Sequence, residues 1–194
     1  MAKYRSAVRT TPDDAEARNC LGIALLHSDD QMGAEIQFAD ALQINPDSAH
    51  LHNNLGVMML FLGPELELAI DEFRTAIRLD PGYPEAHTNL ADAVAPMAGG
   101  LDEAIAEYRT VLQIEPDSIE VAHAHANLGT LLFRKEDVEG AIAEYRAALD
   151  LVPTHGQANH NLRLALETTG DLHSVVVQYS PAFRVSTQRR LKNI

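Results

Sequence analysis

The sequence predicts an all-α solenoid of stacked helix-turn-helix repeats. Its 194 residues include 28 Ala and 24 Leu, which favour packed helices, whereas the prolines occur singly. Five prolines recur at intervals of 34 to 37 residues: Pro12, Pro46, Pro81, Pro116 and Pro153. The segments that end at the last four, residues 38–46, 73–81, 108–116 and 145–153, are similar to one another. A period of this length is typical of helix pairs that stack into a solenoid.

The proline spacing also places the individual helices. The first helices of the repeats are expected near residues 14–28, 48–62, 84–97, 118–134 and 156–168. The second helices are expected near residues 31–44, 66–79, 101–114, 137–151 and 171–179. Each proline ends a helix because it lacks a backbone N–H. The residue after it offers an oxygen that can cap the next helix: Asp13, Asp47, Asp117 or Thr154.

Small residues recur in the middle of the expected helices. Gly22, Gly56 and Gly129 lie inside first helices, where Gly costs about 1 kcal/mol relative to Ala. Such a cost indicates that a neighbouring helix approaches too closely for a side chain. The first four of the second helices each carry an Ala and, four residues later on the same face, an aromatic residue. These pairs are Ala34 with Phe38, Ala69 with Phe73, Ala104 with Tyr108, and Ala141 with Tyr145.

Together these residues resemble the tetratricopeptide repeat, which has Leu-Gly in its first helix and an Ala, aromatic, Ala, Pro series in its second. The resemblance implies a right-handed α-solenoid of about five units after an N-terminal half unit. The expected units lie near residues 1–12 (partial), 13–47, 48–82, 83–117, 118–154 and 155–180. Residues 181–194 are expected to form a basic C-terminal tail.

Both ends depart from the repeat pattern. Tyr4 and Pro12 match the second helix of a unit whose first helix would precede Met1, so we expect either a longer array or a partner that covers this face. No acidic residue follows Asp171. The tail residues that could dock to a partner are Phe183, Arg184, Arg189, Arg190 and Lys192.

Asparagines recur at one position of the first helices. Asn54, Asn89, Asn127 and Asn161 each directly precede the leucine that recurs in the first helices, and Cys20 takes this place in the first full unit. In the family, similar asparagines form a ladder that holds the backbone of an extended peptide, as in the repeats of the O-linked N-acetylglucosamine transferase. An amide suits this contact because it both donates and accepts. The alternative is that these amides only brace the neighbouring turn.

Further candidate peptide contacts lie on the same first-helix face. They are Asn53, Val57, Leu60, Phe61, Phe133 and Arg134, with Ile23, Leu26 and Leu164 as additional apolar candidates. Half of the apolar positions could equally be core. A clamp for acidic chaperone tails would be incomplete, because the cations on these helices are only Arg18, Arg134, Lys135 and Arg163.

Composition and motifs argue against several functions. The formal net charge of −13 disfavours a surface that binds nucleic acid phosphates. The longest apolar run, residues 55–63, is too short to cross a bilayer, and no secretory leader is apparent, so we expect a cytoplasmic protein without direct membrane insertion. One Cys cannot form an internal disulfide.

No motif indicates catalysis, a cofactor or a metal. His50 with His52 and His123 with His125 are two residues apart, so on a helix their side chains diverge. His52, His87 and His125 occupy equivalent positions where we expect packing residues. No nucleophile–base series or phosphate-binding loop is present. We therefore expect a protein that is not an enzyme and has no cofactor.

Three functional hypotheses follow. The first is a protein-interaction adaptor that binds an extended protein segment in its concave groove. The second is a structural subunit of a larger assembly, docked through the N-terminal half-repeat and the basic tail. The third is the repeat region of a longer enzyme, such as a glycosyltransferase.

Overall fold

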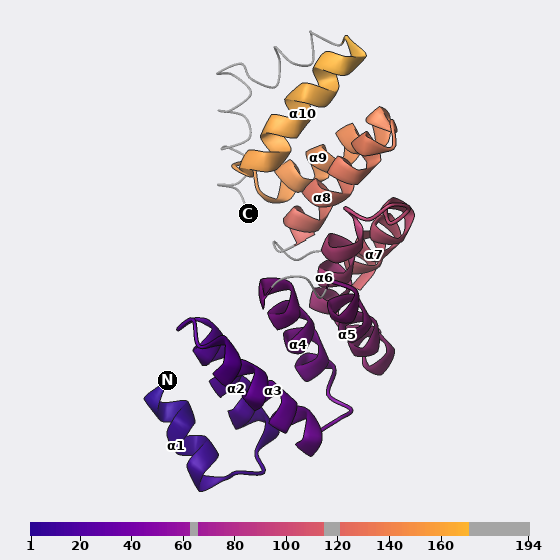
Figure 1. The fold of residues 1–194 in the computed structure, drawn as a ribbon. Helices are drawn as coiled ribbons and strands as arrows, with labels where there is room; N and C mark the ends of the chain where they lie inside the picture. The colour runs from indigo at the N-terminus through magenta and orange to yellow at the C-terminus, as the bar shows by residue number, and fades with distance from the viewer. Residues whose placement is uncertain (63–65, 115–120, 171–194) are drawn as a thin grey trace. The chain divides into compact units, whose positions relative to one another are not determined.

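The computed structural model describes residues 1–62, 66–114 and 121–170, and within them all regular structure is α-helical. The ten helices are α1 (Ala2–Thr10), α2 (Ala15–Leu26), α3 (Gln31–Ile44), α4 (Ala49–Leu62), α5 (Leu66–Leu79), α6 (Pro84–Val94), α7 (Leu101–Ile114), α8 (Val121–Arg134), α9 (Val138–Leu151) and α10 (Gly156–Thr169). Figure 1 shows them in chain order. The prediction of an all-α helical repeat is confirmed.

The helices fall into two compact units, residues 1–97 and 98–194. In the first unit, α2 pairs with α3 and α4 pairs with α5, while α1 packs on α2 and α6 on α5 (Figure 1). The first helices α2, α4 and α6 also contact one another in sequence. In the second unit, α8 pairs with α9, α7 packs on α8, and α10 contacts both α8 and α9. The predicted repeat 83–117 thus has α6 in one unit and α7 in the other.

Glycine and aromatic residues set the distance between paired helices. A Cβ atom on Gly56 would lie 2.6 Å from the ring of Phe73, and one on Gly129 would lie 2.7 Å from the ring of Tyr145. Both rings are at most 1% exposed, so neither can move away into solvent. The predicted close approach at the mid-helix glycines is therefore confirmed.

Most predicted helix limits agree with the structure, but two first helices are shorter than expected. α2 ends at Leu26 rather than 28 because the chain turns through Asp29, whose φ is +61°. α6 ends at Val94 rather than 97 because Pro96 lacks the N–H that the next helical hydrogen bond requires. The predicted helix 171–179, residues 118–120 and the whole tail 181–194 lie outside the described residues.

The helix caps lie one residue later than predicted. Asp14, rather than Asp13, accepts a hydrogen bond from the backbone N–H of Ala17 (3.0 Å). At the four repeat prolines that the structure describes, Pro12, Pro46, Pro81 and Pro153, the proline and the next residue form a turn, so the cap falls on the residue after that turn. The other corrected caps are Ser48 in place of Asp47 and His155 in place of Thr154, whereas Asp117 lies outside the described residues.

The turn between α8 and α9 contains a residue in a left-handed conformation. Glu136 has φ of +65°, and Asp137, which follows it, caps α9 by accepting from the N–H of Gly140 (2.9 Å). A left-handed conformation costs a non-glycine residue roughly 1–2 kcal/mol.

We expect Glu136→Gly to raise the free energy of unfolding by about 0.5–1 kcal/mol, because glycine removes this strain at some cost in chain entropy. Urea unfolding of the purified protein measures the change. Glu139→Gly is the control: Glu139 lies in the first turn of α9, so the same replacement there should destabilise the protein. Equal losses in both variants would contradict the strain at Glu136.

Candidate functional site

In the first unit, the amides of two predicted ladder residues are held by the preceding first helix. Asn54 Nδ2 in α4 donates to Asn19 Oδ1 in α2 (2.9 Å). Asn89 Nδ2 in α6 donates to Asn53 Oδ1 in α4 (2.8 Å). Asn19 and Asn53 are each only 4% exposed, whereas Asn54 and Asn89 are half-buried. The side-chain amides of Asn54 and Asn89 are therefore held by the preceding first helix and remain partly exposed to solvent.

Asn53 itself is a brace in this structure. Its Nδ2 donates to the hydroxyl of Tyr83 (3.3 Å), just before α6, and its Oδ1 accepts from Asn89. Burial raises the pKa of the Tyr83 hydroxyl, with the nearby Glu85 carboxylate adding to the effect. The ring of Tyr83 also lies against His50, with ring centroids 4.6 Å apart. These contacts hold the N-terminal end of α6 in place and, through Asn53, orient the side chain of Asn89.

Exposed apolar side chains occur on the same first helices, α2 and α4. Val57 and Leu60, three and six residues after Asn54, are each 39% exposed, and Ile23 on α2 is 36% exposed. Leu26 instead packs against the core cluster that includes Leu21 and Phe38. Phe61 belongs to α4, but its side chain is not among those described. We call Ile23, Asn54, Val57, Leu60 and Asn89 the first-helix face of this unit.

The second unit braces its two ladder asparagines differently. Asn127 Nδ2 in α8 donates to the hydroxyl of Tyr108 in α7 (2.8 Å), and its Oδ1 accepts from Gln157 of α10 (3.2 Å). Asn161 Nδ2 in α10 donates to Thr130 Oγ1 in α8 (3.1 Å). Nearby, Leu164 is 39% exposed, Phe133 is half-buried, and Arg134 is exposed.

The bracing residues Asn19, Tyr108 and Thr130 were not among the candidates from sequence. One signal was available, because Asn19 and Asn53 are 34 residues apart, as Pro12 and Pro46 are. A second signal is the change of the second-helix aromatic residue from Phe to Tyr in the later repeats. At the ladder position of α2, Cys20 is half-buried, and burial raises the pKa of its thiol.

The residue two positions before the ladder residue ties its helix to the preceding proline turn in α2, α4, α6 and α10, and to a carboxylate of α9 in α8. His52 Nε2 lies 2.9 Å from the carbonyl oxygen of Pro46, and its Nδ1 lies 2.6 Å from a Glu72 carboxylate oxygen. The prediction that His52, His87 and His125 only pack is therefore incomplete. The equivalent contacts are His87 with Pro81, His125 with Glu144, Arg18 with Pro12 and Asp40, and Asn159 with Pro153.

His155 caps α10 and carries a pH dependence. Its Nδ1 accepts from the N–H of Ala158 (3.2 Å), so the ring proton resides on Nε2, which faces Nδ1 of His123 (3.1 Å). Burial, reinforced by His123, lowers the pKa of His155 from its ordinary 6.5. The unfolded chain consequently binds the proton first as the pH falls, and the cap contribution is present at neutral pH and decreases below about pH 6.5.

We therefore expect His155→Ser, which keeps a capping oxygen but does not titrate, to lose less stability than the wild type on acidification. Urea unfolding at about pH 7.5 and about pH 5 gives the two losses. Their difference should be on the order of 1 kcal/mol or less, since one cap contributes about that much. Carboxylates titrate in both proteins and cancel in the comparison. An identical loss in both proteins would show that His155 is not the titrating cap.

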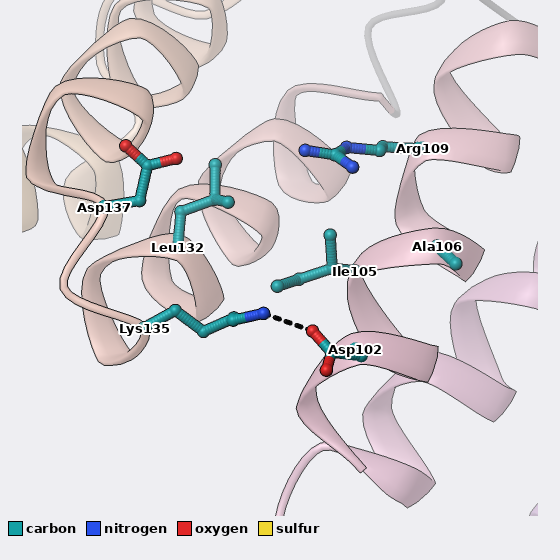
Figure 2. Close-up of a pocket in the computed structure, with 7 residues that line it drawn as sticks. All are labelled: Asp102, Ile105, Ala106, Arg109, Leu132, Lys135 and Asp137. Atoms are coloured by element: carbon teal, nitrogen blue, oxygen red, sulfur yellow. Dashed lines mark hydrogen bonds and ion pairs between the residues drawn. The ribbon is translucent and has the colours of Figure 1, made fainter. Parts of the chain in front are cut away.

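A small cleft of about 260 Å³ lies elsewhere in the second unit, between α7 and the α8–α9 turn. Its lining residues are Asp102, Ile105, Ala106, Arg109, Leu132, Lys135 and Asp137. Figure 2 shows the Lys135 ammonium group paired with Asp102 beside Ile105 and Leu132. Asp137 is already engaged as the cap of α9. The cleft contains none of the predicted site residues.

Among the described residues, no three His, Cys, Asp or Glu side chains are grouped so that they could hold a metal ion. None of the helices in this part of the chain is both long enough and apolar enough to cross a bilayer.

Comparison with family models identifies the repeat. Residues 2–49 and 122–155 match models described as tetratricopeptide repeat, and residues 59–96 match one described as TPR repeat. The chain carries tetratricopeptide repeats. No curated protein is detectably similar to this tetratricopeptide-repeat chain over its sequence.

Solved tetratricopeptide-repeat structures resemble the chain. YrrB, a TPR protein with an unusual peptide-binding site, is 26% identical, with 82% of this chain and 80% of YrrB covered at a TM-score of 0.65. MamA is 23% identical, with 78% and 85% covered and a TM-score of 0.66. PilF of Pseudomonas aeruginosa is 20% identical, with 85% and 73% covered and a TM-score of 0.75. The similarity to MamA and to PilF shows the fold alone. These relatives do not include the O-linked N-acetylglucosamine transferase, so that finer resemblance stays a prediction.

Proposed function

We propose that this tetratricopeptide-repeat chain is a non-catalytic interaction scaffold whose first-helix face binds an extended segment of another protein. One observation carries the proposal: consecutive first helices present braced amides, Asn54 and Asn89, and the helix of Asn54 also exposes Val57 and Leu60. The likeness to YrrB supports the same kind of ligand. A braced amide is preorganised, because little side-chain freedom remains to be lost on binding.

Hydrogen bonds alone would make this contact weak. Each net hydrogen bond contributes about 0.5–1.5 kcal/mol, so the four bonds that two amides can make contribute about 2–6 kcal/mol, and the middle of this range corresponds to roughly millimolar binding. Burial of the exposed parts of Ile23, Val57 and Leu60 has to supply the rest. The ligand should accordingly carry apolar side chains.

Charge further restricts the ligand. The net charge of −13 favours a neutral or basic segment. Three of the four cations that could hold an acidic tail are already engaged: Arg18 pairs with Asp40 (2.6 Å), Lys135 with Asp102, and Arg163 with Glu167 (2.8 Å). An acidic peptide would have to compete with these intramolecular carboxylates.

The second candidate function is a structural subunit of a larger assembly, and one observation favours it. On the second helix α3, Met32 is 74% exposed and Ile36 is 52% exposed, where the equivalent positions of α5 carry Glu67 and Asp71. Two large apolar side chains on an outward face suit a docking contact. The basic tail proposed for the same role lies outside the described residues.

Selection from a library of short random-sequence peptides displayed on phage tests the first proposal. We expect enrichment of neutral or basic peptides with apolar side chains. The same peptide with N-methylated backbone amides should bind more weakly, because methylation removes N–H donors without changing side chains. Equal affinity of the methylated peptide would contradict backbone recognition by the ladder amides. Failure to enrich any peptide would favour the structural-subunit hypothesis.

A further inference from the structure

The two units brace equivalent asparagines with different chemistry. In the first unit, the brace is an asparagine of the preceding first helix, as in the Asn19–Asn54 pair. In α8 the residue equivalent to Asn19 is Ala126, which is fully buried and has no polar side chain. Asn161 therefore bonds to Thr130 Oγ1 instead.

In the second unit, the second-helix aromatic residues carry hydroxyls that take part in bracing these asparagines. Phe38 and Phe73 fill this position in the first unit, whereas Tyr108 and Tyr145 fill it in the second, and all four rings are at most 1% exposed. The Tyr145 hydroxyl donates to Thr130 Oγ1 (3.4 Å), which in turn accepts from Asn161. The Tyr108 hydroxyl accepts directly from Asn127 Nδ2 (2.8 Å). A buried hydroxyl with no partner would be costly, so this contact is energetically favoured.

The Tyr108 contact fixes the orientation of the Asn127 amide. Without it, the amide could rotate or turn towards Gln157, whose Nε2 already donates to Asn127 Oδ1 (3.2 Å). The ring of Tyr108 performs the packing role that phenylalanine performs in α3 and α5. The hydroxyl is thus the one atom at this position that packing does not require.

We propose that Tyr108 is a positioning residue for peptide binding: its hydroxyl holds the Asn127 amide in the orientation that contacts the ligand backbone. This inference rests on the function proposed above. It assigns the Phe-to-Tyr change in the second-helix aromatic position to ligand recognition and not to core packing.

The test is Tyr108→Phe, which keeps the ring and removes one oxygen. Phenylalanine at positions 38 and 73 shows that the fold accepts it in this environment. Tyr4→Phe is the matched control, because Tyr4 packs half-buried against the first core cluster and its hydroxyl makes no hydrogen bond within the described residues. Each variant is examined by the side-chain amide resonances of Asn127 and by its affinity for a library-selected peptide whose binding Asn127→Ala weakens.

In Tyr108→Phe, we expect the Asn127 side-chain amide resonances to shift and the affinity to fall by roughly 2- to 10-fold, the effect of one hydrogen bond. Tyr4→Phe should change neither. Two results in Tyr108→Phe would overturn the positioning role and leave the proposed function standing. One is unchanged Asn127 resonances; the other is a peptide affinity equal to that of the wild type although Asn127→Ala binds the same peptide more weakly. If Asn127→Ala weakens no selected peptide, the inference also fails. If no peptide is enriched at all, the proposed function fails with it.

Discussion

Gly56→Ala is expected to destabilise the first unit by about 1–2 kcal/mol. The added methyl carbon would lie 2.6 Å from the ring of Phe73 and 3.0 Å from the backbone oxygen of Ala69. Overpacking of a filled interior costs about 1–3 kcal/mol, and here the rigid backbone prevents relief, so the upper part of this range applies. Alanine returns about 1 kcal/mol through its higher helix propensity. Urea unfolding measures the net loss.

Gly156→Ala is the matched control for this change. Gly156 begins α10, and a Cβ atom there would meet no atom within 4 Å. The same substitution should therefore be neutral or slightly stabilising. A variant that combines Gly56→Ala with Phe73→Leu, which removes the contacting ring atoms, should recover part of the loss. If Gly56→Ala is as stable as Gly156→Ala, the contact with Phe73 does not set the spacing of α4 and α5.

Asn89→Ala is expected to weaken peptide binding by roughly 5- to 150-fold. The substitution removes a braced amide that can donate to and accept from one peptide unit, a loss of about 1–3 kcal/mol for two hydrogen bonds. It also leaves Asn53 Oδ1, which is buried, without its donor, so stability should fall by about 1 kcal/mol. Calorimetric titration with a library-selected peptide measures the affinity, at a temperature where the variant is fully folded.

The control for Asn89→Ala is Asn45→Ala. Asn45 is exposed and follows the last turn of α3, away from the first-helix face. Its replacement should leave the peptide affinity unchanged. Comparable losses in Asn45→Ala and Asn89→Ala would show that the amide effect is not local to the proposed binding face.

The repeat fold could be predicted from sequence because local chemistry marks each helix. The limits of the second helices 31–44, 66–79 and 101–114 agree with the structure, since prolines and short turns delimit these segments. The tight contacts at Gly56 and Gly129 could also be inferred, because a mid-helix glycine has a cost that only close packing explains.

The bracing of the ladder could not be predicted in the same way. Whether Asn89 meets Asn53, or Asn127 meets Tyr108, depends on the rotation of each helix about its axis and its offset from the neighbouring helix. Repeat spacing gives the order of the helices but not these offsets. The alternatives of bracing and peptide contact at the asparagines are compatible in this structure, since each amide has further donor and acceptor capacity beyond its brace.

The most direct test of the account is to map the binding site of a library-selected peptide by its effect on the amide resonances of the isotope-labelled protein. We predict that the largest shifts occur at the side-chain amides of Asn54 and Asn89 and at the backbone of Val57 and Leu60, with small changes on α3 and α5. The opposite distribution, with the largest shifts around Met32 and Ile36 of α3 and unchanged asparagine amides, would contradict binding at the first-helix face.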